Sequence, residues 1–385
     1  MNFEFATAHR IVFGSGRLAD VGPVSRGRCQ RALVVTGANP ARADRLLSIL
    51  RESGVTAVTF SVPGEPELST VYNGTALARS ESCGSVFGIG GGSVIDAAKA
   101  IAAMMTNEGE LLDYLEIIGK GKPLERPPAP FIAIPTTAGT GAEVTRNAVL
   151  ASPEHKVKVS LRSPMMLPEL ALVDPELTYD LPPALTASTG MDALTQLIEP
   201  YVCNRANSMT DGFCVEGIRR TARSLRAAFE SGTASKVARE DMAMASLLGG
   251  LSLANAGLGA VHGFAGLIGG SFPAPHGAVC AMLLPHVIAI NLRALRQRAN
   301  PSGALQRYDE IARLLTGNPN ATADAGVEWV AKLVADLHIP RLGTYGIRSE
   351  HISDLVARAQ NASSMKANPI VLTSEELAET LTQAI

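Results

Sequence analysis

The stretch Ser85-Val-Phe-Gly-Ile-Gly-Gly-Gly-Ser-Val-Ile-Asp-Ala-Ala-Lys99 decides the fold of the first half of this chain. Its apolar run over 85–89 predicts a buried strand, and the pattern over 94–105 predicts a helix. Three consecutive glycines and Ser93 lie between them. Such glycines let backbone amides approach a phosphate closely, and the helix that follows adds its positive N-terminus. We therefore expect a strand, a phosphate-binding turn and a helix; a tight turn that simply needs glycine is the alternative.

The same alternation of strand and helix surrounds this stretch. Strands are expected over 31–36, 55–62 and 131–135, and helices over 40–53 and 70–82. Continuous apolar strands separated by helices are typical of a parallel sheet that is covered on both faces. The first half therefore predicts an α/β domain.

The character of the sequence changes after Asp174 and the Leu181-Pro-Pro183 break. Strand-like runs vanish, and helical patterns dominate. These patterns cover 190–201, 210–229, 237–253, 307–315 and 327–337. A chain of 385 residues also exceeds the size at which a single core usually stops growing. We predict an α/β domain over 1–181 and an all-helical domain over 182–385.

Composition excludes several classes of function. A net charge of −2 gives no electrostatic reason to expect binding to nucleic acid or to an anionic membrane. The longest apolar stretches, such as 277–290, are interrupted by Gly, Pro or His and are too short to span a bilayer. The N-terminus shows no secretory signal, and the five cysteines lack CxxC spacing. We expect a cytoplasmic protein with reduced thiols that acts on a small-molecule substrate.

A second glycine-bearing loop, Pro135-Thr-Thr-Ala-Gly-Thr-Gly-Ala-Glu-Val144, follows the strand at 131–135. Nucleotides dock at the carboxyl ends of strands in open α/β sheets, so two such loops at neighbouring strand ends support each other. The glycine run follows the third expected strand, whereas the ordinary dinucleotide fingerprint follows the first. Asp96, three residues after Ser93, is expected to cap or orient the glycine loop rather than to contact a ribose.

Two histidines in distinctive settings, His262 and His276, follow in the second half. Asp192 and Gln196 stand four residues apart, so both project from one face of a helix. Imidazole and carboxylate are good ligands for a divalent metal, whereas a neutral amide is a poor one. Cys280 has either a metal or redox role or, as we favour, the role of a buried apolar filler. Glu199 either orients the site or, as we favour, lies on a helix surface.

These motifs together resemble the iron-containing (group III) alcohol dehydrogenase family, which includes maleylacetate reductases. The resemblance is carried by residues 90–99, 135–145 and 190–195, by His262, and by Pro-His-Gly at 275–277 with Leu-Leu-Pro-His at 283–286. It implies a Rossmann-like N-terminal domain with a parallel sheet and an all-α C-terminal domain, the dehydroquinate synthase-like architecture. It also implies a cleft between the domains and a homodimer.

The resemblance assigns roles to particular residues. The pyrophosphate of NAD or NADP would lie on Gly90, Gly91, Gly92 and Ser93, with Asp96 in the same loop region. Thr136, Thr137 and Thr140 would contact the nicotinamide end, and Lys158 would reach the ribose. Fe²⁺ or Zn²⁺ would be held at Asp192, Gln196, His262 and His276, the two histidines being also the catalytic candidates.

Three positions depart from the family pattern. Gln196 and Gly266 stand where many members carry histidine. Gly37 stands where members that prefer NAD often place an aspartate for the ribose 2′-hydroxyl, and Arg42 and Arg45 lie nearby. Without that carboxylate a 2′-phosphate is not repelled, so NADP is expected to be tolerated.

The resemblance implies hydride transfer between a nicotinamide cofactor and an alcohol or aldehyde, assisted by a metal that polarises the substrate oxygen. One alternative is a metal-independent carbonyl reductase of the maleylacetate reductase type. In that case His262 and His276 would themselves donate to the carbonyl oxygen. The other alternative, from a different class, is a nucleotide-binding protein without catalysis.

Overall fold

The computed structural model describes residues 2–155, 157–298 and 303–385. It divides into two compact units, which are considered separately below. The sheet unit comprises Ala6–Thr137 and Gly141–Thr178. The helical unit comprises Met1–Phe5, Ala138–Thr140 and Tyr179–Ile385. The domain boundary between residues 181 and 182 stays a prediction.

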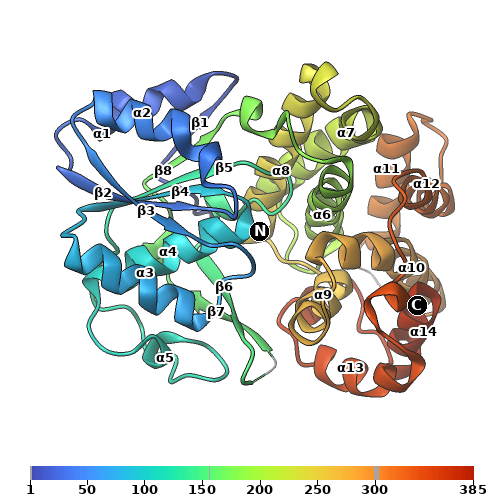
Figure 1. Ribbon diagram of the computed structural model, residues 1–385. Coiled ribbons are helices and arrows are strands. Elements are labelled where there is room, and N and C mark those ends of the chain that lie inside the picture. Colours follow the sequence, from blue (N-terminus) through green and yellow to red (C-terminus); the bar gives the residue numbers. More distant parts are fainter. Residues whose placement is uncertain (1, 156, 299–302) are drawn as a thin grey trace. The chain divides into compact units, whose positions relative to one another are not determined.

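The sheet unit is built on six parallel strands in the order β1-β8-β5-β4-β2-β3 (Figure 1). The strands of this sheet are β1 (Arg10–Phe13), β2 (Arg31–Thr36), β3 (Thr56–Ser61), β4 (Ser85–Gly90), β5 (Phe131–Pro135) and β8 (Leu170–Val173). An antiparallel hairpin of β6 (Asn147–Ser152) and β7 (Val157–Arg162) stands apart from it. The parallel sheet confirms the predicted α/β fold class.

Alternate residues of each central strand enter two different cores. In β2, Leu33 and Val35 join one hydrophobic cluster, whereas Ala32 and Val34 join the other. The first cluster includes side chains of α3 (Leu68–Ser80), α4 (Gly92–Thr106), α5 (Leu111–Tyr114) and the hairpin. The second includes α1 (Val21–Ser25) and α2 (Asp44–Glu52), on the opposite face (Figure 1). Burial on both faces explains why these strands are continuous apolar runs.

The six elements predicted before residue 106 and the strand at 131–135 are all present; β2 and β5 have the predicted ends, and the ends of the others are shifted. The short strands β1 and β8 and the hairpin were not predicted. β1 and β8 have four residues each, too few for a periodic signal. The hairpin strand β6 is only half-buried, with every second side chain in the core. Such a strand lacks the continuous apolar run by which the central strands were recognised.

The helical unit contains no strand among its described residues. Its helices are α6 (Pro183–Val202), α7 (Ser208–Ser231), α8 (Lys236–Asn255), α9 (Ala260–Ser271), α10 (His276–Gln297), α11 (Ala304–Thr316), α12 (Ala323–Asp336), α13 (Ile352–Ala359) and α14 (Ser374–Ala384). The helix expected over 190–201 begins earlier because Pro183 occupies its first turn, where a missing N–H is tolerated. The prolines predicted as a break therefore begin the helix.

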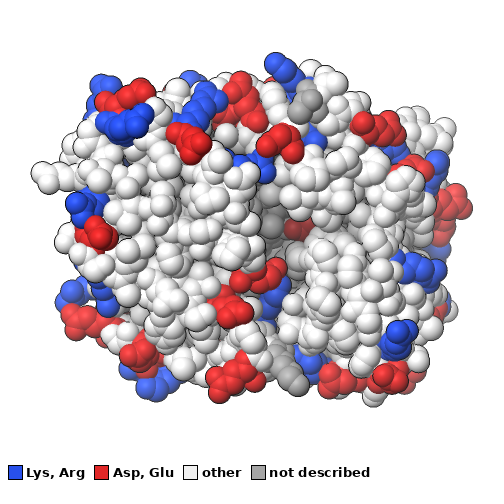
Figure 2. All heavy atoms as spheres, in the orientation of Figure 1, with Lys and Arg blue, Asp and Glu red and all other residues white. Residues whose placement is uncertain are grey.

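Helix α10 is the one described helix that is long and apolar enough by itself to cross a bilayer; the bent pair α8 and α9 also passes that test as one span. In the most apolar window of α10, 83% of the residues are buried inside the protein, as in the core helix of a folded domain. Figure 2 shows acidic and basic side chains interspersed on one face. A surface of mixed charge provides no single-sign field that would steer a polyanion.

Candidate functional site

The carboxyl ends of β2 and β4 mark the point where the sheet order reverses. Strand β2 pairs with β3 on one side and with β4 on the other, so the chain crosses over β2 after β3. Ligands of open α/β sheets bind at such a switch point. Gly37 follows β2, and Gly91 follows β4, with Thr36 paired to Ile89 between the two strand ends. The topology thus places two predicted cofactor positions beside each other.

The glycine run has both a packing reason and a binding reason. A Cβ on Gly90 would lie 2.5 Å from Val94 Cγ2, so glycine is required for α4 to leave the strand end so closely. Gly91 is the N-cap of α4, and no side chain caps that end. The N-terminal amides of α4, which Gly92 and Ser93 begin, are therefore available for an anion.

The threonine loop is divided between the two units. Thr136 belongs to the sheet unit, where its N–H donates to Gly90 O at 2.9 Å. Thr137 lies next to Gly91, since a Cβ added to Gly91 would lie 3.3 Å from Thr137 Cγ2. Thr140, by contrast, belongs to the helical unit with residues 138 and 139. The sequence analysis assigned all three threonines to the nicotinamide end, whereas they belong to two different structural units.

Asp96 and Lys158 have partners within the sheet unit. Asp96 Oδ2 accepts from the Val149 N–H at 3.1 Å, so this hydrogen bond joins Asp96 to β6 rather than to the glycine loop. Lys158 Nζ forms an ion pair with Glu65 Oε2 at 3.1 Å. Burial raises the pKa of Asp96 to about 6, against the opposing effect of Lys99. Asp96 thus fastens the hairpin to α4, which the spacing alone did not indicate.

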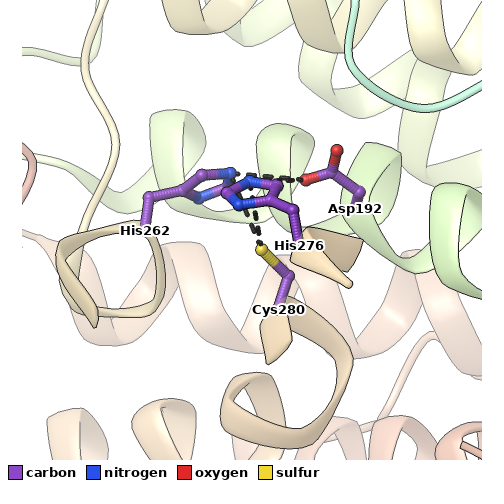
Figure 3. Close-up of side chains that lie close together, drawn as sticks. All are labelled: Asp192, His262, His276 and Cys280. Atoms are coloured by element: carbon purple, nitrogen blue, oxygen red, sulfur yellow. Dashed lines mark hydrogen bonds and ion pairs between the residues drawn. The ribbon is translucent and has the colours of Figure 1, made fainter. Parts of the chain in front are cut away.

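Three helices of the helical unit bring four potential metal ligands together (Figure 3). Asp192 projects from α6, His262 from α9, and His276 and Cys280 from successive turns of α10. Their ligand atoms all lie within 4.8 Å of one another. Gly277 permits this approach, because a Cβ there would lie 2.1 Å from the Ser188 carbonyl oxygen on α6.

The shortest separations run from the imidazole nitrogens to one carboxylate oxygen. Asp192 Oδ1 lies 3.4 Å from His262 Nε2 and 3.7 Å from His276 Nε2. Although His262 is this close, Asp192 Oδ1 has no hydrogen-bond partner among the described residues. A buried acceptor left unsatisfied costs about 1–3 kcal/mol. A cation between these atoms would remove that cost, so Asp192, His262 and His276 fit a divalent metal.

Glu199 fixes the orientation of His262. Its Oε2 accepts from His262 Nδ1 at 2.6 Å, and its Oε1 accepts from the Val261 N–H at 2.7 Å. Because Nδ1 donates to this carboxylate, Nε2 is the nitrogen that faces Asp192 and is left for a metal, which is the usual arrangement of a carboxylate, a histidine and a metal. The favoured interpretation of Glu199 as a surface carboxylate is wrong: its side chain is 4% exposed. It lies three residues from Gln196 on α6, the spacing that pointed to the site.

The electrostatic environment favours positive charge. Burial acts to lower the pKa of His262, but Cys280, Asp192 and Glu199 outweigh it and hold that pKa well above its usual value. Burial likewise opposes a proton on His276, and Cys280 and Asp192 raise its pKa. The same anionic surroundings that favour a proton on an imidazole would stabilise a bound cation.

Two further side chains, Gln196 and Cys280, belong to the surroundings of Asp192 and the histidines. Burial acts to raise the pKa of the Asp192 carboxyl group, but His276, His262 and the Gln196 amide together lower it; the Gln196 Oε1 is buried without a partner among the described residues. Cys280 is buried, as the favoured interpretation as an apolar filler expects, but its Sγ lies 3.7 Å from His276 Nε2 and 3.9 Å from His262 Nε2, so it is also part of the cluster. Its i, i+4 spacing from His276 on one helix was the signal that could have placed it there.

Gly266 and Gly37, the two other departures from the family pattern, both have space around them. A Cβ added to Gly266 would meet nothing within 4 Å, so no side chain replaces the absent histidine there. Gly37 likewise has room, since its Cβ would lie 3.8 Å from the nearest side-chain atom. Arg42 Nη2 donates to Leu177 O at 3.3 Å, and Arg45 pairs with Glu176 at 3.1 Å.

Comparisons with known proteins agree over the whole chain. A family model described as iron-containing alcohol dehydrogenase matches residues 8–175. A second model, the C-terminal part of the Fe-containing alcohol dehydrogenase family, matches residues 186–385.

Individual relatives cover nearly all of the chain. A 1,3-propanediol dehydrogenase of Citrobacter freundii is 36% identical, covering 99% of this chain and 98% of its own length. An NAD-dependent methanol dehydrogenase of Bacillus methanolicus is 32% identical, covering 97% of each chain. The solved structure of an alcohol dehydrogenase from Oenococcus oeni is 31% identical, covers 100% of both chains and has a TM-score of 0.91.

Proposed function

The chain belongs to the iron-containing alcohol dehydrogenase family, and we propose that it uses NAD or NADP together with a divalent metal held by Asp192, His262 and His276. It is an oxidoreductase that acts on alcohols, so the alternative of a nucleotide-binding protein without catalysis is set aside. The observation that carries the metal proposal is the unpartnered, buried Asp192 Oδ1 facing two Nε2 atoms.

The residues of each unit would contribute separately to the reaction. The uncapped N-terminus of α4 supplies amides for the cofactor pyrophosphate at Gly92 and Ser93. In the helical unit, Glu199 keeps the Nδ1 of His262 protonated, so that Nε2 can act as a ligand. A bound divalent cation would act as a Lewis acid on the alcohol oxygen. The alcohol loses a hydride to the oxidised nicotinamide and a proton to solvent, giving a carbonyl compound.

Metal content measured beside activity tests this proposal. We expect alcohol-dependent reduction of NAD or NADP to be lost on chelation and restored by Zn²⁺ or Fe²⁺. Asp192→Asn retains the shape of the side chain but removes its charge. Because Asp192 would bind directly, its loss should exceed the 10- to 100-fold effect, roughly, of an outer contact on metal affinity. Full activity in metal-free protein would refute the metal proposal and favour the metal-independent carbonyl reductase of the maleylacetate reductase type.

We propose that NADP is accepted beside NAD. The support is that position 37 is a glycine and carries no carboxylate that would repel a 2′-phosphate. The space beside Gly37 would admit a carboxylate side chain, so packing does not explain why it is missing. Arg45 pairs with a half-exposed Glu176, and such pairs contribute only about 0–1 kcal/mol, so a 2′-phosphate could replace the partner. Gly37→Asp should lower kcat/KM for NADP relative to NAD by about tenfold or more, equal to about 1.4 kcal/mol. An unchanged ratio would contradict the role of this position.

We further propose a homodimer in the cytoplasm. The dimer rests on the family resemblance and is tested by light scattering during size-exclusion chromatography; a monomeric mass would contradict it. The location is supported by five cysteines that are all present as thiols. Cell fractionation tests it, and recovery in an extracytoplasmic fraction would overturn it.

A further inference from the structure

Cys280 occupies a position that its sequence context did not suggest. Its Sγ faces the two Nε2 atoms that point toward Asp192, at 3.7 Å from His276 and 3.9 Å from His262 (Figure 3). The residue is fully buried, and it belongs to the group of four ligand atoms within 4.8 Å of one another. It comes from the turn of α10 that follows His276.

Four of the six separations between the ligand atoms are close to the edges of a tetrahedral metal centre. Zinc–ligand bonds of about 2.3 Å to sulfur and about 2.0–2.1 Å to nitrogen or oxygen give edges of about 3.6 Å for S···N and about 3.3 Å for O···N. The observed S···N separations of 3.7 and 3.9 Å and O···N separations of 3.4 and 3.7 Å exceed these values only slightly. A small contraction around a cation would complete the centre.

Gln196 is arranged differently from a ligand. Its side chain adjoins Asp192, whose pKa it helps the two histidines to lower against the effect of burial. Its Oε1 lies toward α8, where a Cβ on Gly249 would be 3.5 Å from it. An amide whose oxygen lies toward α8 does not contribute that oxygen to the cluster.

We propose that the Cys280 thiolate is the fourth protein ligand, with Asp192, His262 and His276, and that this donor set binds Zn²⁺ in preference to Fe²⁺. This inference rests on the proposed metal-dependent function. A set of one sulfur, two nitrogens and one oxygen is softer than one in which an imidazole replaces the sulfur, and thiolate favours zinc over iron. Binding replaces the thiol proton, which is released to solvent, and no electron is transferred. Gln196 is a positioning residue for Asp192.

Four protein ligands still leave access for a substrate. The His276 side chain is 34% exposed, so the cluster is open on that side. Zinc in catalytic sites can expand from four to five ligands. The thiolate therefore does not turn the centre into a closed structural site.

Cobalt substitution tests the sulfur ligand directly, without relying on activity. Purified protein is stripped of metal and titrated with Co²⁺ while the near-ultraviolet spectrum is recorded. We expect one thiolate-to-cobalt charge-transfer band that saturates at one equivalent and is absent from Cys280→Ser and Cys280→Ala. The control is Cys83→Ala, which removes another buried thiol, in the sheet unit. Its band should be unchanged.

Competition with a chromophoric chelator then ranks the ligands. Cys280→Ala should weaken Zn²⁺ binding by more than the 10- to 100-fold, roughly, of an outer contact, whereas Gln196→Ala should remain within that range. Zn²⁺ should displace Fe²⁺ more readily from wild type than from Cys280→Ala. Circular dichroism checks that each variant is folded.

The outcomes separate this inference from the proposed function. Cobalt bound without a charge-transfer band, or a band that survives in Cys280→Ser, would overturn the sulfur ligand and leave the metal proposal standing. A larger loss in Gln196→Ala than in Cys280→Ala would assign the fourth position to the amide. Protein that binds neither Co²⁺ nor Zn²⁺ would overturn both proposals.

Discussion

Replacing Glu199 by glutamine separates the shape of this side chain from its charge. The carboxylate accepts two hydrogen bonds, from His262 Nδ1 at 2.6 Å and from the Val261 N–H at 2.7 Å. Glutamine has one acceptor oxygen, and its NH₂ group must then face one of these donors. One buried donor is left unsatisfied, at a cost of about 1–3 kcal/mol, and a charge-assisted hydrogen bond is lost.

Only part of that cost lowers the affinity for the metal. The unsatisfied donor is present with and without a cation, so it mainly lowers the free energy of unfolding. The metal affinity falls because Nδ1 is no longer held by an anion, which makes Nε2 less basic and less firmly oriented. We expect Zn²⁺ to bind about 10- to 100-fold more weakly to Glu199→Gln. That loss equals about 1.4–2.7 kcal/mol.

The assay is chelator competition on wild type, Glu199→Gln and a matched control. Asp241 is also a buried carboxylate of the helical unit, and it is engaged by Arg220, Arg223 and Ser224. Asp241→Asn should lower stability while leaving the Zn²⁺ affinity unchanged. If Glu199→Gln bound Zn²⁺ as tightly as wild type, or if Asp241→Asn lost affinity equally, the positioning role of Glu199 would be refuted.

Three further predictions concern packing and ionisation. Gly90→Ala should destabilise the protein by about 1–3 kcal/mol in urea unfolding, because the added Cβ lies 2.5 Å from Val94 Cγ2; unchanged stability would contradict the tight turn. Gly266→Ala should raise the free energy of unfolding by about 0.5–1 kcal/mol, since alanine is the better helix former and nothing lies within 4 Å; a loss would show that this space is filled. Burial raises the pKa of Glu143 from 4.5 to about 7, so its contribution to stability is present below pH 4.5 and lost as the pH rises through about 7. Melting curves should therefore show Glu143→Gln gaining on wild type between about pH 5 and about pH 8, and a pH-independent difference would count against this ionisation.

Local sequence was sufficient for the elements that carry strong periodic signals. The runs at Arg31–Thr36 and Ser85–Gly90 predicted strands buried on both faces because their apolar residues enter one or the other of two cores. The weakly patterned hairpin β6–β7 could not be predicted in this way. Half of the side chains of β6 face away from the core. The position of the hairpin is therefore decided by the contacts of β6 with α4, which include the hydrogen bond from the Val149 N–H to Asp96.

For the candidate site, sequence alone determined the residue types and the family. The i, i+4 spacing of Asp192 and Gln196 on one helix, the two histidines in their glycine-containing motifs and the two glycine-bearing loops are local features, and each can be found along the chain. Through their resemblance to the iron-containing alcohol dehydrogenase family, these features were enough to predict a nicotinamide-dependent oxidoreductase.

Only the tertiary structure decided which side chains meet at the cluster and what each contributes. Glu199 became a partner of His262 because the N-terminus of α9 packs against α6, and Cys280 entered the cluster because Gly277 brings α10 against the same helix. A ligand set depends on distances of a few ångströms between helices far apart in sequence. Spacing along one helix fixes which face a side chain occupies, but not which neighbouring helix lies opposite it.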